Sequence, residues 1–343
     1  MRFVVFTIRN RCATRKPRPG RGRGPVGAGP AHYAGPVPSL LARLRSDRRV
    51  RLAVLAAVLV FAALALADRW DEARGALAAL PPWALPASLV CALAALGGQM
   101  MAWRALLAGL GSPLPVATAA RAMFVGQLGK YLPGSVWAFA AQVELARDHE
   151  VPRHRGAAAT VQAVAVTLAA NLAVAAATLP FASEEATRRW WWALLLAPVL
   201  LAALHPRVVE AALDTAMRLL KRPAEVRVDG RSTAAALGWT LAAWVPLSLH
   251  IGTLVAGADG AGWRALPIAA GAYALAWTLG VLFVIAPAGV GVRELVLVVA
   301  LSPVLTPGAA LVVAALSRLV MTAADLAAAG LAGWRARRTP AQD

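Results

Sequence analysis

Acidic residues are scarce in this chain of 343 residues, with 17 aspartates and glutamates against 35 lysines and arginines. Charged residues make up 15% of the sequence, whereas soluble domains carry about 25%. Hydrophobic residues reach 59%, above the roughly 45–50% of soluble domains. These proportions exclude an ordinary soluble domain. They predict a membrane protein, because several apolar runs approach the ~20 residues that a membrane-spanning helix needs.

Cysteine is almost absent, and the motifs of common cofactor sites are missing. Cys12 lies in a basic segment and Cys91 in an apolar run, so neither a disulfide nor a metal site is predicted. His149 and His154 lack the spacing of a zinc-binding HExxH motif. The stretch "GRGPVG" at residues 22–27 matches a dinucleotide-binding pattern, but neither a strand before it nor a helix after it is predicted. With no P-loop and no nucleophile motif, we predict no cofactor, no metal and no use of ATP.

The net charge of +18 lies mostly in the tails and in the loops between apolar runs. Lysine and arginine in such loops mark the cytoplasmic side of a membrane, so the charge predicts orientation and not nucleic-acid binding. Both termini and the loops 146–156 and 205–232 are expected in the cytoplasm, and loops 68–82, 181–189 and 258–264 outside. The chain is therefore predicted to be a multi-pass protein of the inner (plasma) membrane.

The chain divides into three regions. Residues 1–49 are rich in arginine, proline and glycine without apolar periodicity, which predicts a disordered basic cytoplasmic tail. Two interpretations of this tail are open: it binds anionic lipid headgroups, or translation starts downstream of it. Residues 50–335 form the membrane domain, and residues 336–343 a short C-terminal tail.

The predicted fold is all-α, a polytopic membrane protein of about eight transmembrane helices with one or two broken or re-entrant segments. The segment at residues 114–146 is either a re-entrant hairpin or a pair of crossings. Loop 205–232 has the pattern of an amphipathic surface helix. The predicted crossings are residues 50–67, 83–103, 157–179, 190–204, 233–256, 266–286, the apolar run from 292 to about 305, and 309–334.

Two apolar stretches are interrupted by helix-breaking residues with polar neighbours. One is "LGKYLPGSVWAFAAQVE" at residues 128–144, and the other is "PAGVGVRE" at residues 287–294. Non-helical backbone at membrane depth is tolerated only where protein or a water-filled cavity covers it. Paired broken helices, one in each half of a chain, indicate a transporter's substrate site. The alternative is that both breaks are plain kinks.

The candidate substrate-binding residues lie in these two breaks and in the last predicted span. Ionisable groups within a span are functional candidates because inserting them is costly. We predict that cations in this set hold a phosphate headgroup and that its glutamates orient those cations or a substrate amine. The candidates are Lys130, Tyr131, Pro133, Gly134, Trp137, Gln142, Glu144, Pro287, Gly289, Gly291, Arg293, Glu294, Arg318 and Asp325.

Some polar residues in the predicted spans also fit a structural role. Arg318 and Asp325 are seven residues apart and so share a helix face, which also fits an ion pair between packed helices. Gln99, Asn171 and His250 are expected to form interhelical hydrogen bonds.

"LGKYLPGSVWAF" with its following glutamine, "PAGVGVRE", and an arginine in the last span resemble flippase-like integral membrane proteins. That family is related to the transmembrane region of lysylphosphatidylglycerol synthase, and the resemblance covers roughly residues 50–335. It implies movement of an aminoacylated or glycosylated (polyprenyl-phosphate) lipid between leaflets. The soluble aminoacyl-transferring domain of the full synthase has no counterpart here, so lysine transfer from tRNA is not expected.

Two other functions stay open from the sequence. One is a non-transporting membrane subunit that serves a cell-envelope glycosyltransferase. The other is an integral-membrane lipid transferase. The expected partners are anionic or polyprenyl-phosphate membrane lipids, with a glycosyltransferase in the accessory case, and no nucleic acid.

Overall fold

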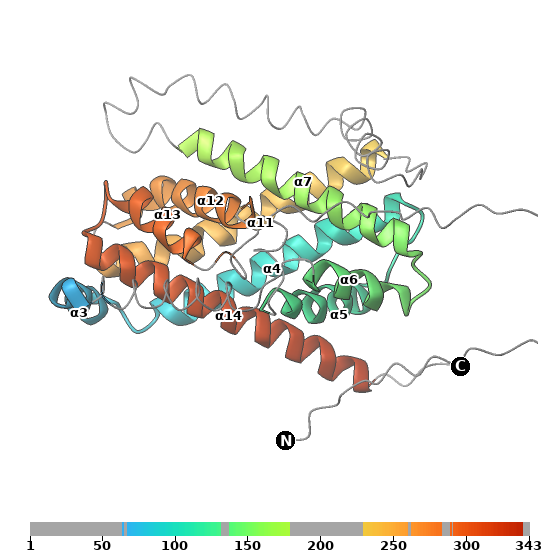
Figure 1. Cartoon of the computed structure of the whole chain (residues 1–343), viewed down its shortest axis with the longest axis horizontal. Coiled ribbons are helices and arrows are strands. Elements are labelled where there is room, and N and C mark those ends of the chain that lie inside the picture. The colour runs from blue at the N-terminus through green and yellow to red at the C-terminus, as the bar shows by residue number, and fades with distance from the viewer. Residues whose placement is uncertain are drawn as a thin grey trace, which may run out of the picture. The chain divides into compact units, whose positions relative to one another are not determined.

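A computed structural model describes residues 64, 67–131, 137–178, 229–259, 262–282, 289 and 291–338 of the chain (Figure 1). The described part is all-helical, which confirms the predicted fold class for it. The tail 1–49, most of the span 50–67, the span 190–204, loop 181–189 and residues 205–228 and 339–343 lie outside the described residues. The helices are α3 (Trp70–Ala79), α4 (Ala84–Gly109), α5 (Val116–Gln127), η1 (Leu128–Tyr131), α6 (Trp137–Arg147), α7 (Arg153–Thr178), α11 (Gly230–Asp259), η3 (Gly262–Ala265), α12 (Leu266–Leu282), α13 (Val292–Leu301) and α14 (Pro307–Arg338).

Four of these helices, α4, α7, α11 and α14, are long and apolar enough to cross a membrane. The shortest has 26 residues, or roughly 39 Å at 1.5 Å per residue, which exceeds the ~30 Å hydrocarbon core. Their alanine- and leucine-rich sequences favour helix throughout. Four of the predicted spans, 83–103, 157–179, 233–256 and 309–334, are thereby confirmed as long apolar helices.

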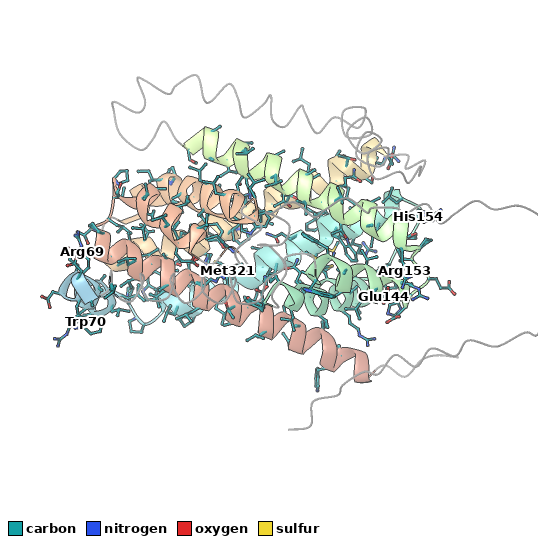
Figure 2. The ribbon with its side chains drawn as sticks, viewed as in Figure 1. Arg69, Trp70, Glu144, Arg153, His154 and Met321 are labelled. Carbon is teal, nitrogen blue, oxygen red and sulfur yellow. The ribbon has the colours of Figure 1, made fainter. Side chains whose placement is uncertain are left out.

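The long helices run between two ends of the molecule, as the labelled residues in Figure 2 show. At one end, which we call the Glu144 end, Arg155 of α7 donates to the Gly111 carbonyl at 3.0 Å. At the other, the Glu72 end, the Glu72 carboxylate accepts from the Gly308 N–H at 2.8 Å. Helices α4 and α14 therefore run from the Glu72 end to the Glu144 end, and α7 and α11 run back.

Helices α5 and α6 form a short hairpin with η1 near its tip. They have 12 and 11 residues, roughly 18 and 17 Å, so neither crosses a membrane alone. Helix α5 starts just after α4 ends and α6 ends just before α7 begins, so both outer ends of the hairpin lie at the Glu144 end. The two helices pack very closely, because a Cβ at Gly126 would lie 2.8 Å from the backbone of Gln142.

Helices α12 and α13 form a second hairpin that returns to the Glu72 end. The chain turns back between them, because a Cβ at Gly289 would lie 2.9 Å from the Gly280 carbonyl oxygen. Gly289 and Gly291 have φ values of 68° and 88°, which favour glycine. Helix α13 starts at Val292 and has 10 residues, roughly 15 Å, so this part of the interrupted apolar run is a half-helix that is too short to cross a membrane alone. Helix α12, with 17 residues, is also short for the crossing predicted at 266–286.

The core consists mainly of small and branched apolar side chains. The largest cluster joins α7, α11, α12, α13 and α14 around Tyr273 and Ile251, and a second surrounds Trp103 on α4. Close approach depends on small residues, as at Gly98, where a Cβ would lie 2.7 Å from the Ala243 Cβ. Small residues at helix interfaces are typical of membrane proteins. This packing holds the two hairpins between the long helices.

We expect the stability contributed by Glu72 to depend on pH. The Gly308 N–H, and then the charge of Arg69, hold the pKa of the Glu72 carboxyl below its ordinary value of 4.5. The carboxylate also faces the positive N-terminus of α14. A lowered pKa contributes stability above the unfolded pKa and loses it as pH falls through the folded pKa. The difference in thermal midpoint between wild type and Glu72→Gln should be constant above about pH 5 and should shrink below pH 4.5. An unchanged difference down to pH 3 would contradict this.

Candidate functional site

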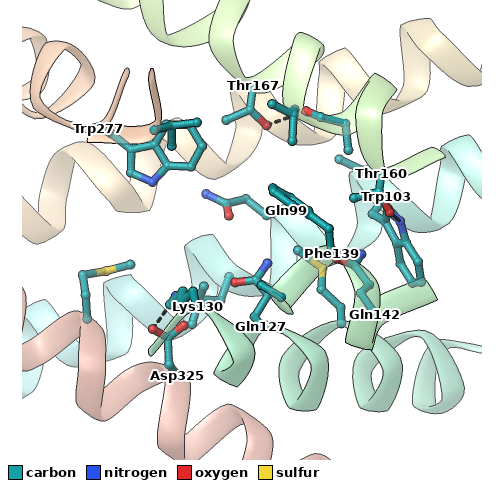
Figure 3. Close-up of a pocket in the computed structure, with 18 of the residues that line it drawn as sticks. Gln99, Trp103, Gln127, Lys130, Phe139, Gln142, Thr160, Thr167, Trp277 and Asp325 are labelled. Atoms are coloured by element: carbon teal, nitrogen blue, oxygen red, sulfur yellow. Dashed lines mark hydrogen bonds and ion pairs between the residues drawn. The ribbon is translucent and has the colours of Figure 1, made fainter. Parts of the chain in front are cut away.

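A cavity of about 290 Å³ lies where the tips of the two hairpins approach each other (Figure 3). Its walls come from both hairpins and from the long helices α4, α7, α11 and α14. Its lining includes the charged residues Lys130, Arg293, Arg318 and Asp325, together with glutamines, threonines and aromatic rings. A polar cavity enclosed by apolar helices is the expected location of a binding site in such a protein.

The charged part of the lining is organised around Asp325 of α14, which is 4% exposed. Its Oδ2 atom lies 2.6 Å from Lys130 Nζ and accepts a hydrogen bond from the Tyr131 hydroxyl, also at 2.6 Å. Lys130 and Tyr131 belong to η1, so this cluster fastens the tip of the first hairpin to the last long helix. The Lys130 side chain keeps 30% of its surface accessible and lines the cavity.

A second ion pair fastens the other hairpin to the same helix. Arg318 Nη1 lies 3.1 Å from Glu294 Oε1. The second oxygen of Glu294 accepts from the Gly291 N–H at 2.7 Å, at the start of α13. Glu294 thus satisfies a free N–H at the helix N-terminus, where a negative charge is favourable.

Arg293 differs from the other two cations of the cavity. Its Nη2 atom donates to the Tyr273 hydroxyl at 3.2 Å, and its guanidinium lies 5.7 Å from the centre of the Tyr273 ring. Within the described part of the chain, Arg293 has no carboxylate partner. The three cations Lys130, Arg293 and Arg318 and the two carboxylates Asp325 and Glu294 therefore leave a formal charge of 3 − 2 = +1. This arrangement suits an anionic ligand.

Three amides also line the cavity, from Gln99 on α4, Gln127 on α5 and Gln142 on α6, and they are directed toward the same space (Figure 3). None of these amides hydrogen-bonds to another described residue. Trp277 and Phe139 also line the cavity. This wall offers both donors and acceptors together with apolar ring surfaces.

The structure brings together most of the predicted site residues. Gly291 and Glu294 adjoin the cavity as partners of the cations. Pro133, Gly134 and Pro287 lie outside the described residues. The predicted residues that line the cavity are Lys130, Tyr131, Gln142, Gly289, Arg293, Arg318 and Asp325.

Two predicted site residues lie elsewhere. Glu144 is at the outer end of α6, where Arg147 and Arg153 bind it at 2.6 and 2.9 Å. Hydrogen bonds from Arg147, and then from Arg153, hold the pKa of the Glu144 carboxyl below its ordinary value. Trp137 is 58% exposed and does not line the cavity. The cause is the helix face: Trp137 and Glu144 are seven residues apart and share a face of α6, and the cavity is lined from the opposite face by Ala138, Phe139 and Gln142.

Three polar residues were expected to form interhelical hydrogen bonds, and the structure places them in three different surroundings. His250 is fully buried and bridges two helices, with Ser88 Oγ 2.7 Å from Nδ1 and Ser317 Oγ 3.0 Å from Nε2. This prediction is confirmed. Gln99 faces the cavity instead, and the buried Asn171 Nδ2 atom has no partner among the described residues.

Sequence reasoning missed the aromatic and hydroxyl residues of the cavity. Tyr273 and Trp277 of α12 line it, as do Trp103 and Thr160, whose side chains are joined by a 3.3 Å hydrogen bond. The sequence did contain a signal for Tyr273 and Trp277. Residues four apart share a helix face, and the tyrosine is one of only three in the chain.

Long apolar helices that surround a charged and polar cavity define this chain as a multi-pass helical membrane protein. Its sequence matches the model of the family described as lysylphosphatidylglycerol synthase TM region over residues 50–329. The chain belongs to this family. A comparison with curated proteins found no match.

Proposed function

We propose that this protein moves a lipid with an anionic headgroup, aminoacylated or glycosylated (polyprenyl-phosphate), between the leaflets of the plasma membrane. The observation that carries the proposal is Arg293, a cation with a tyrosine but no described carboxylate as partner, in a cavity of net positive charge. Arginine binds phosphate through several N–H groups at once. The lipid tails would remain in the bilayer while the headgroup occupies the cavity.

The proposed topology has six crossings and two re-entrant hairpins. The crossings are α4, α7, α11, α14 and the segments 50–67 and 190–204. The α5–α6 hairpin enters from the cytoplasm and the α12–α13 hairpin from outside, and their tips meet near mid-membrane. The Glu144 end carries Arg147, Arg153 and Arg155, so the positive-inside rule assigns it, and both termini, to the cytoplasm.

Alternating access would follow from small movements of the hairpin tips. Asp325 and Glu294 connect each tip to α14 through ion pairs, and a bound phosphate would compete for the same cations. Binding could thus loosen one pair at a time and open the cavity to one side. The proposal requires no cofactor. Both carboxylates are held by cations, which argues against a membrane-bound acid–base catalyst.

The direct test is leaflet exchange of labelled lipids in liposomes that contain the purified protein. We expect Arg293→Gln to slow exchange at least tenfold, because it removes the arginine that is free to bind phosphate. Arg74→Gln is the matched control, because it removes one positive charge from an exposed position on α3.

Equal exchange rates for the two variants would contradict the assignment of Arg293. Absence of exchange by folded protein for every lipid tested would overturn transport. The same cavity would then favour an accessory subunit that holds a lipid phosphate for a glycosyltransferase partner.

A further inference from the structure

We infer that the headgroup bound in the cavity is a phosphate joined to an uncharged, hydroxyl-rich group such as a sugar, and not an aminoacyl group with a free ammonium. The inference rests on the proposed function and selects one of its two substrate classes. It is carried by the paired charges of the cavity and by the amides that line the same space.

An ammonium group would find no available carboxylate among the described residues of the cavity. Asp325 is engaged by both Lys130 and Tyr131, each at 2.6 Å. Glu294 is engaged by Arg318 and by the Gly291 N–H. An ammonium would have to share or displace a carboxylate that already balances a cation of the protein, which would leave one positive charge uncompensated.

The cations would also repel a positively charged headgroup. Lys130, Arg293 and Arg318 all line the cavity. Aromatic rings can bind ammonium groups through their faces. The two tyrosine rings next to the carboxylates already have cation partners, Arg293 at 5.7 Å from the Tyr273 ring and Lys130 at 5.4 Å from the Tyr131 ring, so an ammonium at Trp277 or Phe139 would lie without a carboxylate partner.

The three amides that line the cavity match the hydrogen-bonding groups of a sugar. Each amide of Gln99, Gln127 and Gln142 offers two donors and a carbonyl acceptor, and none is used by another described residue. Gln142 is only 4% exposed, and its side chain lines the cavity, so its amide is available to a ligand there. Sugar hydroxyls both donate and accept, so one ring could satisfy several of these groups.

Aromatic rings and the size of the cavity support the same class. Trp277 and Phe139 provide apolar ring faces beside the amides, which suit the C–H face of a sugar. The volume of about 290 Å³ is at the lower end of the roughly 300–1,000 Å³ of small-molecule pockets. It suits a compact headgroup, with the lipid tails outside.

The first experiment compares binding and leaflet exchange for five lipids in the same proteoliposomes. They are a hexosyl-phosphoryl-polyprenol, polyprenyl monophosphate, phosphatidylinositol, phosphatidylglycerol and lysyl-phosphatidylglycerol. We expect the two lipids with a phosphate-linked hydroxylated ring to bind at least tenfold more tightly than lysyl-phosphatidylglycerol. The polyprenyl and phosphatidyl forms distinguish the two sources of such a headgroup.

The second experiment removes the amides while keeping side-chain length. We expect Gln99→Met with Gln127→Met to reduce the ratio of hexosyl-phosphoryl-polyprenol binding to polyprenyl monophosphate binding at least fivefold. Arg74→Gln should leave this ratio unchanged, and a thermal melt checks that each variant is folded.

The outcomes separate the inference from the proposed function. Preferred binding and exchange of lysyl-phosphatidylglycerol would keep transport and overturn the inference. Preferred binding of the glycosylated lipid without any exchange would keep the inference and overturn transport. An unchanged binding ratio in the double variant, or no binding of any of the five lipids, would also overturn the inference.

Discussion

Replacing Asp325 by leucine is expected to lower the free energy of unfolding by about 3–5 kcal/mol, the usual cost of removing one partner from a buried ion pair. Asp325 is 4% exposed, and its Oδ2 atom contacts both Lys130 and Tyr131. Without the carboxylate, the Lys130 ammonium would share the cavity with Arg293 and Arg318 and would have no paired carboxylate among the described residues. The tip of the first hairpin would lose its attachment to α14 as well.

The double variant Lys130→Met with Asp325→Leu identifies the source of that loss. Because it leaves no unpaired charge, we expect it to recover at least half of the stability lost in Asp325→Leu. Glu144→Gln is the matched control at an exposed ion pair and should lower the unfolding midpoint least of the three variants. Unfolding midpoints in detergent measure all three. A double variant as unstable as Asp325→Leu would show that the carboxylate acts through something other than Lys130.

The location of the site could be predicted from the two broken segments. Helix-breaking glycines and charged side chains are costly in a membrane unless they share a protected space, and the structure shows Lys130 and Arg293 lining one cavity. The same logic identified Arg318 and Asp325, which lie on one face of α14. Composition and spacing were enough to select these residues as candidates, because placing a charged side chain in a membrane has a high free-energy cost in any fold.

The ion-pair partners could not be predicted in this way. Arg318 and Asp325 share a helix face, but each binds a residue from a different hairpin, 24 and 195 positions away (318 − 294 and 325 − 130). Partner choice is decided by which helices pack against α14, and local spacing contains no information about that. Glu144 lies outside the cavity for a related reason. Its charge resembled that of Glu294, but it lies on the face of α6 opposite Gln142, and the packing that selects this face is not visible in local spacing.

The turn after α12 could not be predicted from the sequence either. An apolar run interrupted by Pro287, Gly289 and Gly291 fits both a kinked crossing and a reversal. The structure distinguishes them through the approach of Gly289 to the Gly280 carbonyl and through the ten-residue length of α13. Hydropathy measures how apolar a segment is and does not show the direction in which it continues.

Replacing Gly126 by valine is expected to lower the free energy of unfolding by about 3 kcal/mol, at the upper end of the usual cost of overpacking. A Cβ at Gly126 would lie 2.8 Å from both the Cα and N atoms of Gln142. These are backbone atoms, so no rotation of a side chain relieves the overlap. The two helices would have to separate, which would move Lys130 and Gln142 at the lining of the cavity.

Gly97→Val is the matched control for this prediction, since Gly97 is also in a helix and a Cβ there would meet nothing within 4 Å. Both variants replace a helical glycine by valine, a somewhat better helix former, so the propensity change is of the same kind in each and their difference in unfolding midpoint reports the contact between α5 and α6. If Gly97→Val lowers the midpoint as much as Gly126→Val, the seam between the helices is not what limits stability. If Gly126→Val alone is destabilised and also loses lipid exchange, the close packing of the first hairpin is what holds its half of the binding site in position.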